Sequence, residues 1–364
     1  MGNVHGNPPA HSRPFIFISA VLLVLACDSS HQAITPTSPE EDPVTEEASV
    51  PDTVGLGAAS VLHDSVSFRL FVAAIDTLAS FGDRRGSSTS YEAAEAWVIA
   101  RLESYGYAVG LHEYTWGTRS RVNLYATKIG SAFPDEMLII SAHLDGRGGG
   151  GAVDDDASGV ALVLEAARLL APANVVTERS VRFILWNNEE DGLVGSSAYV
   201  RDRAALQGTE TPPGSGLYPE PNWIGILQHD MILFDHGVPA GPSQSDDADI
   251  QVTYQAASTQ ADASLDLALS FFDFNMTAGG EYPVVVEAGM RSTDSWPFKD
   301  HTAALSLQEN SASAISALGA NPHWHQSSDV METYEEADFR LGLHTAKLTL
   351  RAVVEIAGVR VLGG

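Results

Sequence analysis

The chain has 364 residues, enough to bury a substantial hydrophobic core in one large domain or two small ones. Its hydrophobic fraction of 44% and charged fraction of 18% are ordinary for a globular protein, but its formal net charge of -27 is strongly acidic. That charge argues against nucleic acid and anionic lipid surfaces as partners, because both carry dense negative charge themselves.

The first element along the chain is a targeting segment. Arg13 precedes an apolar run at residues 15–26, which is too short to span a bilayer comfortably and has the length of a signal-peptide core. The run ends at Cys27, the only cysteine, and Val24-Leu25-Ala26-Cys27 resembles a bacterial lipobox. We therefore expect residues 1–27 to be a signal peptide and Cys27 to be the lipidated first residue of the mature protein. A plain secretory signal is the alternative.

A flexible tether is expected at residues 28–55, which are rich in Pro, Thr, Ser and Glu and poor in large apolar side chains. The folded domain is expected over residues 56–364. This arrangement predicts a protein of the bacterial cell envelope, extracytoplasmic and anchored in the membrane through Cys27 on the periplasmic side, or secreted if Cys27 is not lipidated. With a single cysteine, no disulfide can form within one chain.

Hydrophobic periodicity predicts alternating strands and helices through this domain. Strands are expected at 122–129, 137–142, 180–186, 223–227 and 303–307, and helices at 91–105, 159–170, 193–205, 265–272 and 335–356. The alternation predicts an α/β fold, a three-layer α/β/α sandwich whose mixed, mostly parallel central sheet has helices on both faces. In such sheets, ligands bind at the carboxyl ends of the strands.

Candidate metal ligands follow three of these strands. His143 comes after strand 137–142, Glu189-Glu190 after strand 180–186, and Asp230 after strand 223–227. His143 reads as a ligand whose ring is oriented by the carboxylate of Asp145, although a histidine at a strand end needs no metal. One glutamate of an adjacent pair can bind a metal while the other takes a proton from water.

Three consecutive aspartates, Asp154 to Asp156, follow a glycine run at residues 148–151. Glycines allow a tight turn, and crowded carboxylates are costly unless a cation or solvent offsets their charge. An acidic turn that caps the helix at residue 159 would explain Asp156, with Ser158 as a second capping candidate, but it explains Asp155 less well. Two further pairs each offer a choice of ligand, His229 or Asp230, and His323 or His325.

Taken in order, these segments resemble the bacterial two-zinc aminopeptidases of metallopeptidase family 28. The resemblance lies in His143-x-Asp145, Gly151–Gly159, Asn188–Ser196, Asp294–Phe298 and His325-x-x-x-Asp329, and it extends from about residue 56 to the C-terminus. It implies a zinc-exopeptidase fold and two Zn²⁺ ions per chain.

The resemblance also implies a role for each residue. Asp155 matches the carboxylate that bridges the two zinc ions, His143 and Asp230 match the other ligands of one zinc, and Glu190 and His325 those of the second. Glu189 matches the general base that activates the attacking water, and Asp145 the residue that orients His143. Asp294 and Trp324 are possible substrate contacts, although Ser295 stands where the family usually has histidine.

The expected activity is therefore that of a zinc metallo-aminopeptidase, an exopeptidase acting on peptides with a free N-terminus. Two alternatives on the same fold are carboxypeptidase activity and glutaminyl cyclisation, which relatives perform with one zinc. Trp324 before His325 resembles those cyclases. A non-catalytic lipid-anchored binding protein would have lost a ligand or the base, and all six positions are filled. The sequence leaves open the residue preference and the oligomeric state.

Overall fold

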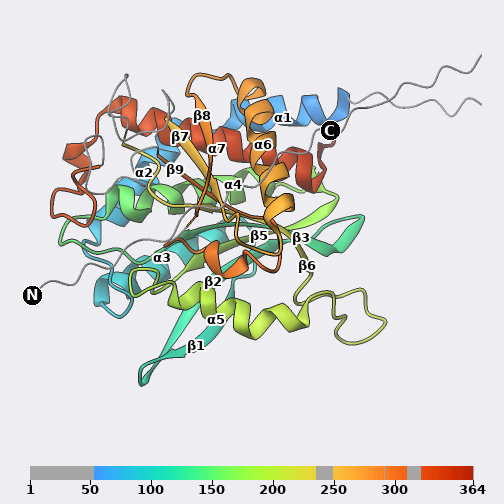
Figure 1. Cartoon of the computed structure of the whole chain (residues 1–364), viewed down its shortest axis with the longest axis horizontal. Helices are drawn as coiled ribbons and strands as arrows, with labels where there is room; N and C mark the ends of the chain where they lie inside the picture. Colours follow the sequence, from blue (N-terminus) through green and yellow to red (C-terminus); the bar gives the residue numbers. More distant parts are fainter. Residues whose placement is uncertain (1–52, 235–248, 291, 310–320, 364) are drawn as a thin grey trace, which may run out of the picture. The chain divides into compact units, whose positions relative to one another are not determined.

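The computed structural model describes residues 53–234, 249–290, 292–309 and 321–363 (Figure 1). The predicted signal peptide with Cys27, and the predicted tether as far as residue 52, lie outside the described residues. Helix α1 (Thr53–Ser65) begins at Thr53, so the last three residues of the range predicted as tether belong to a helix.

The described part of the chain contains an eight-stranded sheet in the order β1-β2-β5-β3-β6-β9-β7-β8. The strands are β1 (Gly110–Trp116), β2 (Arg119–Lys128), β3 (Phe133–His143), β5 (Arg179–Trp186), β6 (Asn222–His229), β7 (Ile250–Tyr254), β8 (Val284–Ala288) and β9 (Ala304–Glu309). The four central strands β5, β3, β6 and β9 are parallel, as are β7 and β8, whereas β1–β2, β2–β5 and β7–β9 pair antiparallel. The sheet is therefore mixed and mostly parallel, as predicted.

Helices cover both faces of this sheet. The remaining helices are α2 (Phe68–Ser80), α3 (Thr89–Ser104), α4 (Gly159–Leu170), α5 (Val194–Arg203), α6 (Ala261–Thr277) and α7 (Glu336–Ala357). Figure 1 shows α4 and α7 on one side of the sheet and α5 on the other. Strand β3 explains the layering, because Leu138 and Ile140 join the core under α4 and α7 while Met137 and Ile139 join a smaller core with Tyr199 of α5. The predicted three-layer α/β/α class is confirmed.

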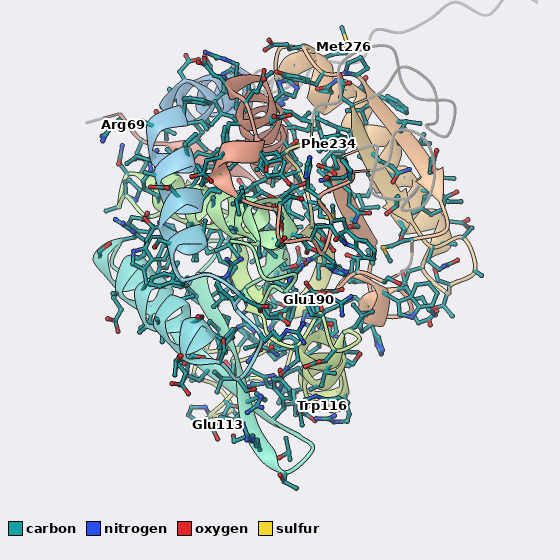
Figure 2. All side chains as sticks on the ribbon, turned by 90° about the vertical axis from the view of Figure 1, so that its left-hand side faces the viewer. Arg69, Glu113, Trp116, Glu190, Phe234 and Met276 are labelled. Carbon is teal, nitrogen blue, oxygen red and sulfur yellow. The ribbon has the colours of Figure 1, made fainter. Side chains whose placement is uncertain are left out.

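The predicted strands and helices are all present, with bounds shifted by a few residues. Several elements were not predicted: α1, α2, β1, β7, β8 and the two-stranded ribbon of β4 (Val175–Thr177) and β10 (Val359–Val361). Figure 2 shows the β1–β2 hairpin, with Glu113 and Trp116, projecting past the rest of the domain, and Glu190 lying further in. No single helix in the described residues has the length and hydropathy of a membrane span; Gly57–Ser65 and Phe68–Ser80, bent by 52°, meet that test only together.

A buried ion pair anchors the end of the long loop before β6. The Arg182 guanidinium donates to Glu220 at 2.6 Å, and the hydroxyl of Tyr199 and the indole N–H of Trp223 donate to the same carboxylate at 2.9 and 2.5 Å. The side chains of Arg182 and Glu220 are 4% and 1% exposed. Removing one partner of such a pair leaves the other charge buried without compensation.

We expect Glu220→Ala to lower the free energy of unfolding by about 3–5 kcal/mol, because it strands the Arg182 guanidinium in the core. The matched control is Glu136→Ala, which removes the partner of Arg179 in a pair whose side chains are 35% and 30% exposed. That change should cost about 1 kcal/mol or less. Urea unfolding of both variants measures the difference, and equal losses would contradict the role given to Glu220.

Candidate metal centre

The predicted ligands meet at the carboxyl ends of the central strands. His143 is the last residue of β3, Glu189 and Glu190 follow β5, and Asp230 follows β6. Asp155 lies in the segment Val153–Ser158 that leads into α4, and its own backbone is non-helical, with φ of -108° and ψ of 82°. Because these strands are parallel neighbours, their ends lie at one edge of the sheet and bring together residues far apart in sequence.

Two groups of side chains could each hold a metal ion, with ligand atoms within 4.8 Å of one another. The first ligand group is His143, Asp155 and Asp230, and the second ligand group is Asp155, Glu190 and His325. In the first group, His143 Nε2 lies 3.1 Å from Asp155 Oδ1 and 3.6 Å from Asp230 Oδ1. In the second, His325 Nε2 lies 3.0 Å from Asp155 Oδ2 and 2.9 Å from Glu190 Oε2. Asp155 thus presents one oxygen to each group.

The unsatisfied atoms of these groups fit a cation. Among the described residues, His143 Nε2, Asp155 Oδ2 and Glu190 Oε1 are buried polar atoms without a hydrogen-bond partner. Such atoms cost about 1–3 kcal/mol each when left unpaired. Imidazole nitrogens and carboxylate oxygens are the donors that zinc takes in sites without thiolates. The residues present therefore suit zinc in both groups.

Burial and close charges shift the pKa values at this edge of the sheet. Burial opposes the charge on Asp155, but the adjacent imidazoles of His143 and His325 hold the pKa of Asp155 below its usual range. Burial likewise opposes the charge on His143, yet the surrounding aspartates raise the pKa of His143 well above its usual value. Burial raises the pKa of Asp145 to about 7. The pKa of Glu189 also rises well above its usual value, through burial and through Asp230 and its other acidic neighbours.

Asp145 is placed differently from the sequence prediction. His143 Nδ1 lies 3.0 Å from the backbone carbonyl oxygen of Asp145 and 3.7 Å from its carboxylate. The carboxylate oxygens instead accept the backbone N–H groups of Glu189 and Glu190 at 3.2 and 3.3 Å. Asp145 therefore ties the end of β3 to the loop after β5, and its carbonyl takes the orienting role that we expected of its side chain.

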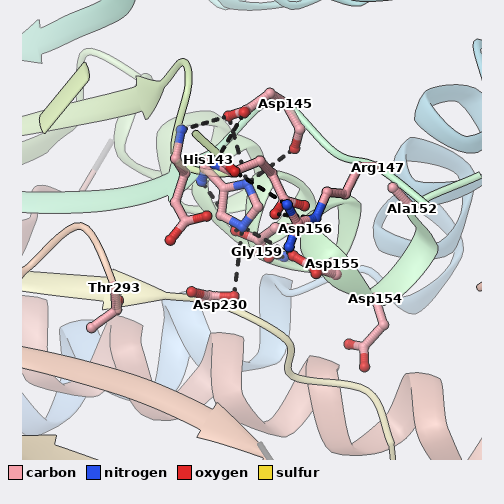
Figure 3. A network of polar contacts seen from close by, with 12 residues as sticks. His143, Asp145, Arg147, Ala152, Asp154, Asp155, Asp156, Gly159, Asp230 and Thr293 are labelled. Atoms are coloured by element: carbon pink, nitrogen blue, oxygen red, sulfur yellow. Dashed lines mark hydrogen bonds and ion pairs between the residues drawn. The ribbon is translucent and has the colours of Figure 1, made fainter. Parts of the chain in front are cut away.

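Each of the three consecutive aspartates has a different task (Figure 3). Asp156 accepts the N–H of Gly159 at 2.9 Å and that of His143 at 3.1 Å, which confirms it as a cap of α4. Ser158 makes no such cap; its hydroxyl donates to the carbonyl oxygen of Asp154 at 2.7 Å. Figure 3 shows Asp154 directed away from His143. Only Asp155 faces both histidines.

The glycine run allows two loops to touch backbone to backbone. Gly148 has a φ of +108°, and a Cβ there would lie 2.7 Å from the carbonyl carbon of His325. The N–H of Gly151 donates to the carbonyl oxygen of Asp329 at 2.9 Å. Arg84 is fully buried and donates hydrogen bonds to the carbonyl oxygens of Gly151 at 2.6 Å and Ala152 at 3.0 Å, at the end of the glycine run. The glycines thus position His325 as well as Asp155.

The two other candidate histidines are engaged elsewhere. His229 is buried, with ring nitrogens 3.2 Å from the carbonyl oxygen of Ser141 and 2.8 Å from the hydroxyl of Thr349. Burial lowers the pKa of His229 to about 4. His323 Nδ1 lies 2.9 Å from the hydroxyl of Ser328. The choices of Asp230 over His229 and of His325 over His323 thus agree with the geometry.

A cavity of about 950 Å³ opens onto both ligand groups. Trp324, which stacks on His325 with ring centroids 3.7 Å apart, lines it. Asp294, predicted as a possible substrate contact, is fully buried and is absent from this lining; its carboxylate accepts the hydroxyl of Ser196. Because Asp294 is fully buried and does not line the cavity, it is not placed to contact a substrate there.

Several lining residues were not anticipated from the sequence. They are Arg147, Met231, Gln251, Thr253, Met290, Trp296 and Gln308. Gln251 and Thr253, which are also buried, alternate with the apolar Ile250 and Val252 on β7, and Gln308 is paired opposite Gln251 on β9. The apolar–polar alternation of residues 250–253 was the available signal of a strand with one face toward a polar space.

Comparisons with known proteins agree with this site. The model of peptidase family M28 matches residues 123–341, which include both ligand groups. The chain belongs to peptidase family M28.

Among curated relatives, leupeptin-inactivating enzyme 1 of Streptomyces exfoliatus is 32% identical over 126 residues, which are 35% of this chain and 28% of that protein. The probable lipoprotein aminopeptidase LpqL of Mycobacterium tuberculosis is 34% identical over 177 residues, 46% of this chain and 34% of that protein. The chain thus matches about a third of the length of these relatives. The crystal structure of the Legionella pneumophila LapA aminopeptidase is similar in fold, with a TM-score of 0.62 at 19% identity, covering 83% of this chain and 75% of that one.

We expect Gly148→Ala to weaken zinc binding at the second ligand group by about tenfold or more, because its Cβ would displace the backbone of His325. Gly149→Ala is the matched control: Gly149 also has a positive φ, of +81°, but a Cβ there meets no atom within 4 Å. Zinc titration calorimetry of the two variants separates the contact from the backbone strain common to both. Equal weakening in both would show that the Gly148–His325 contact is unimportant.

Proposed function

We propose that this protein is a two-zinc aminopeptidase that removes N-terminal residues from peptides. The observation that carries the proposal is the position of Asp155, whose two carboxylate oxygens face His143 and His325 in two different ligand groups. A single shared carboxylate between two groups favours a pair of metal ions over one. That arrangement supports hydrolysis more than the one-zinc cyclisation chemistry of related proteins.

The residues divide the work as follows. Zinc, when bound, supplies a Lewis acid for the scissile carbonyl and makes water more acidic. Glu189 lines the cavity but belongs to neither ligand group, so its carboxylate is available to take a proton. In this role Glu189 would pass that proton on to the departing amine. The Asp145 carboxylate accepts the backbone N–H groups of Glu189 and Glu190 and so fixes the positions of the proposed base, Glu189, and the proposed ligand, Glu190.

The family and two relatives support the choice of activity. Proteins of family M28 are peptidases, and both LpqL and LapA are named as aminopeptidases. Carboxypeptidase Q also matches this chain, at 30% identity over 109 residues of the mouse protein, so carboxypeptidase activity is the outcome to test against.

We expect Glu189→Gln to lower kcat by about 10²- to 10⁴-fold while leaving the zinc content unchanged, because it removes the base and keeps the ligands. The assay is hydrolysis of leucyl-p-nitroanilide beside its N-acetylated twin, with and without a chelator. An aminopeptidase cleaves only the free-amine substrate, loses that activity with the chelator and regains it with zinc. The matched control is Glu113→Gln on the β1–β2 hairpin, an exposed glutamate that should leave kcat unchanged.

Cleavage of a C-terminal peptide substrate instead of leucyl-p-nitroanilide would reassign the protein as a carboxypeptidase. Full activity of Glu189→Gln would remove Glu189 from the mechanism. A wild-type protein that binds no zinc would contradict the metal centre as a whole.

We also propose that the protein is an extracytoplasmic lipoprotein of the bacterial envelope, anchored through Cys27. The lipobox-like sequence supports this, as does the relative named a probable lipoprotein aminopeptidase. Cys27→Ser should move the protein from the membrane fraction to the soluble fraction and remove the lipid mass from its N-terminal peptide. An unchanged distribution between the fractions would contradict the anchor.

A further inference from the structure

A second, smaller cavity lies where three helices meet. Its volume is about 140 Å³, and its lining includes Ser60 and His63 of α1, Ala278 at the end of α6, and Lys347 and Arg351 of α7. None of its lining residues lines the cavity at the metal centre. Figure 1 shows α1 beside α6 and α7. The small cavity is therefore separate from the site already described.

The charge of this lining is opposite to that of the whole chain. Although the protein has a formal net charge of -27, the described residues that line the cavity include two cationic side chains, Lys347 and Arg351, and no carboxylate. The two cations stand four residues apart on α7, a spacing at which like charges are neighbours and destabilise a helix. An anion bound between them would replace this repulsion with attraction.

Arg351 has hydrogen-bond donors that the fold does not use. Its side chain is 12% exposed, and its ion pair with Glu355 is made through Nη2 at 2.5 Å. Nε and Nη1 are both buried, and neither has a hydrogen-bond partner among the described residues. A guanidinium carries five N–H donors and no acceptor, so only an acceptor group can satisfy them. Buried donors without partners are unfavourable, and the hydrogen bonds that they would make to an anion are of the strong, charge-assisted kind.

His63 joins α1 to the end of α6 at the wall of the cavity. Its Nε2 lies 3.1 Å from the carbonyl oxygen of Ala278, and its Nδ1 lies 3.2 Å from Asp64 Oδ1. Because a carbonyl oxygen only accepts, His63 donates to Ala278 and covers an acceptor that would repel an anion. The Ser60 hydroxyl is 3.5 Å from Asp64 Oδ2, at the limit of a hydrogen bond, and can turn its donor toward the cavity. Donors are thus available from α1 as well as from α7.

We propose that this cavity is a binding site for a small oxyanion of the phosphate class, held by Arg351 and Lys347 with the exposed Ser60 hydroxyl beside it. Guanidinium and ammonium groups are the side chains that bind phosphate in proteins, and phosphate has enough oxygens to accept from both helices at once. The volume of about 140 Å³ is below the roughly 300 Å³ at which pockets for larger organic ligands begin, so the site suits an ion with a few waters. The bound anion joins α1 to α7.

The test is a titration of the full chain with inorganic phosphate, followed by NMR at the backbone N–H groups of Ser60 and Ala278 and at the Nε–H of Arg351. These signals report on this cavity, so phosphate that binds to a metal ion elsewhere in the protein is not counted. The wild-type signals should shift and then saturate. A titration that leaves all three signals unmoved would overturn the inference.

Variants on α7 assign the binding to the two cations, with the backbone signals as the readout. Arg351→Met and Lys347→Met should each weaken phosphate binding by about tenfold or more, because each removes a charged donor. The matched control is Arg340→Met, on the same helix and with the same kind of ion pair, to Glu336, but outside this lining; it should bind phosphate like the wild type. Glu355→Gln removes the carboxylate that competes for Arg351 and should tighten phosphate binding.

Phosphate affinity that is unchanged in both Arg351→Met and Lys347→Met, or weakened equally in Arg340→Met, would overturn the site. The tightening expected of Glu355→Gln does not follow from a purely structural role for Arg351, because that change also breaks an ion pair.

Two further titrants identify the source of the phosphate. Glycerophosphoethanolamine carries the phosphodiester of a lipid headgroup in soluble form, and acetate carries a carboxylate. Tighter binding of inorganic phosphate assigns the site to free phosphate or a phosphate monoester, and tighter binding of the diester assigns it to a lipid headgroup; both results uphold the site. Acetate that binds more tightly than either would overturn the phosphate class. None of these results bears on the zinc centre, so the proposed function is tested separately.

Discussion

The architecture of this site depends on concentrating negative charge where solvent is largely excluded. Asp155, Glu190 and Asp230 approach one another at the carboxyl ends of parallel strands, beside Glu189. Carboxylates packed this closely raise one another's pKa values, and the structure opposes that effect with the imidazoles of His143 and His325. The buried atoms left without hydrogen bonds in both ligand groups are what a pair of divalent cations would satisfy.

The surrounding residues keep this arrangement from relaxing. Asp145 connects the end of β3 to the glutamate pair, and Asp329 accepts the backbone N–H groups of Asp154 and Asp155 at 2.9 and 3.3 Å. Arg84, fully buried, ties the glycine run to the end of α2 through the carbonyl oxygen of Leu78. The side chains that face the cavity are thus fixed by backbone contacts behind them, which is how a scaffold holds a reactive group within a narrow range of positions.

The two ligand groups differ in burial and in their contact with Arg147. Both groups contain Asp155, one further carboxylate and one histidine, and among the described residues only the second group contacts a guanidinium. The cavity beyond them is bordered by polar side chains of β7 and β9 and by Met231, Met290 and Trp296. Its wall is therefore mixed in character, with the metal ligands at one end and amide and hydroxyl groups along one side.

The sequence by itself determined the α/β class, the helix and strand positions around the site, and the order of the candidate ligands. It did so because strand-end positions follow from hydrophobic periodicity, and the spacing of His143, Asp155 and the glutamate pair is local to short motifs. It did not reveal β8, or β7, in which the cavity-lining Gln251 and Thr253 alternate with apolar residues. Only the tertiary structure decided that Asp294 is buried, that the carbonyl of Asp145 orients His143, and that Arg147 contacts His325 across 178 positions of the chain. Those outcomes depend on which side chains meet in space after the sheet has formed, and no local pattern in a single sequence encodes that.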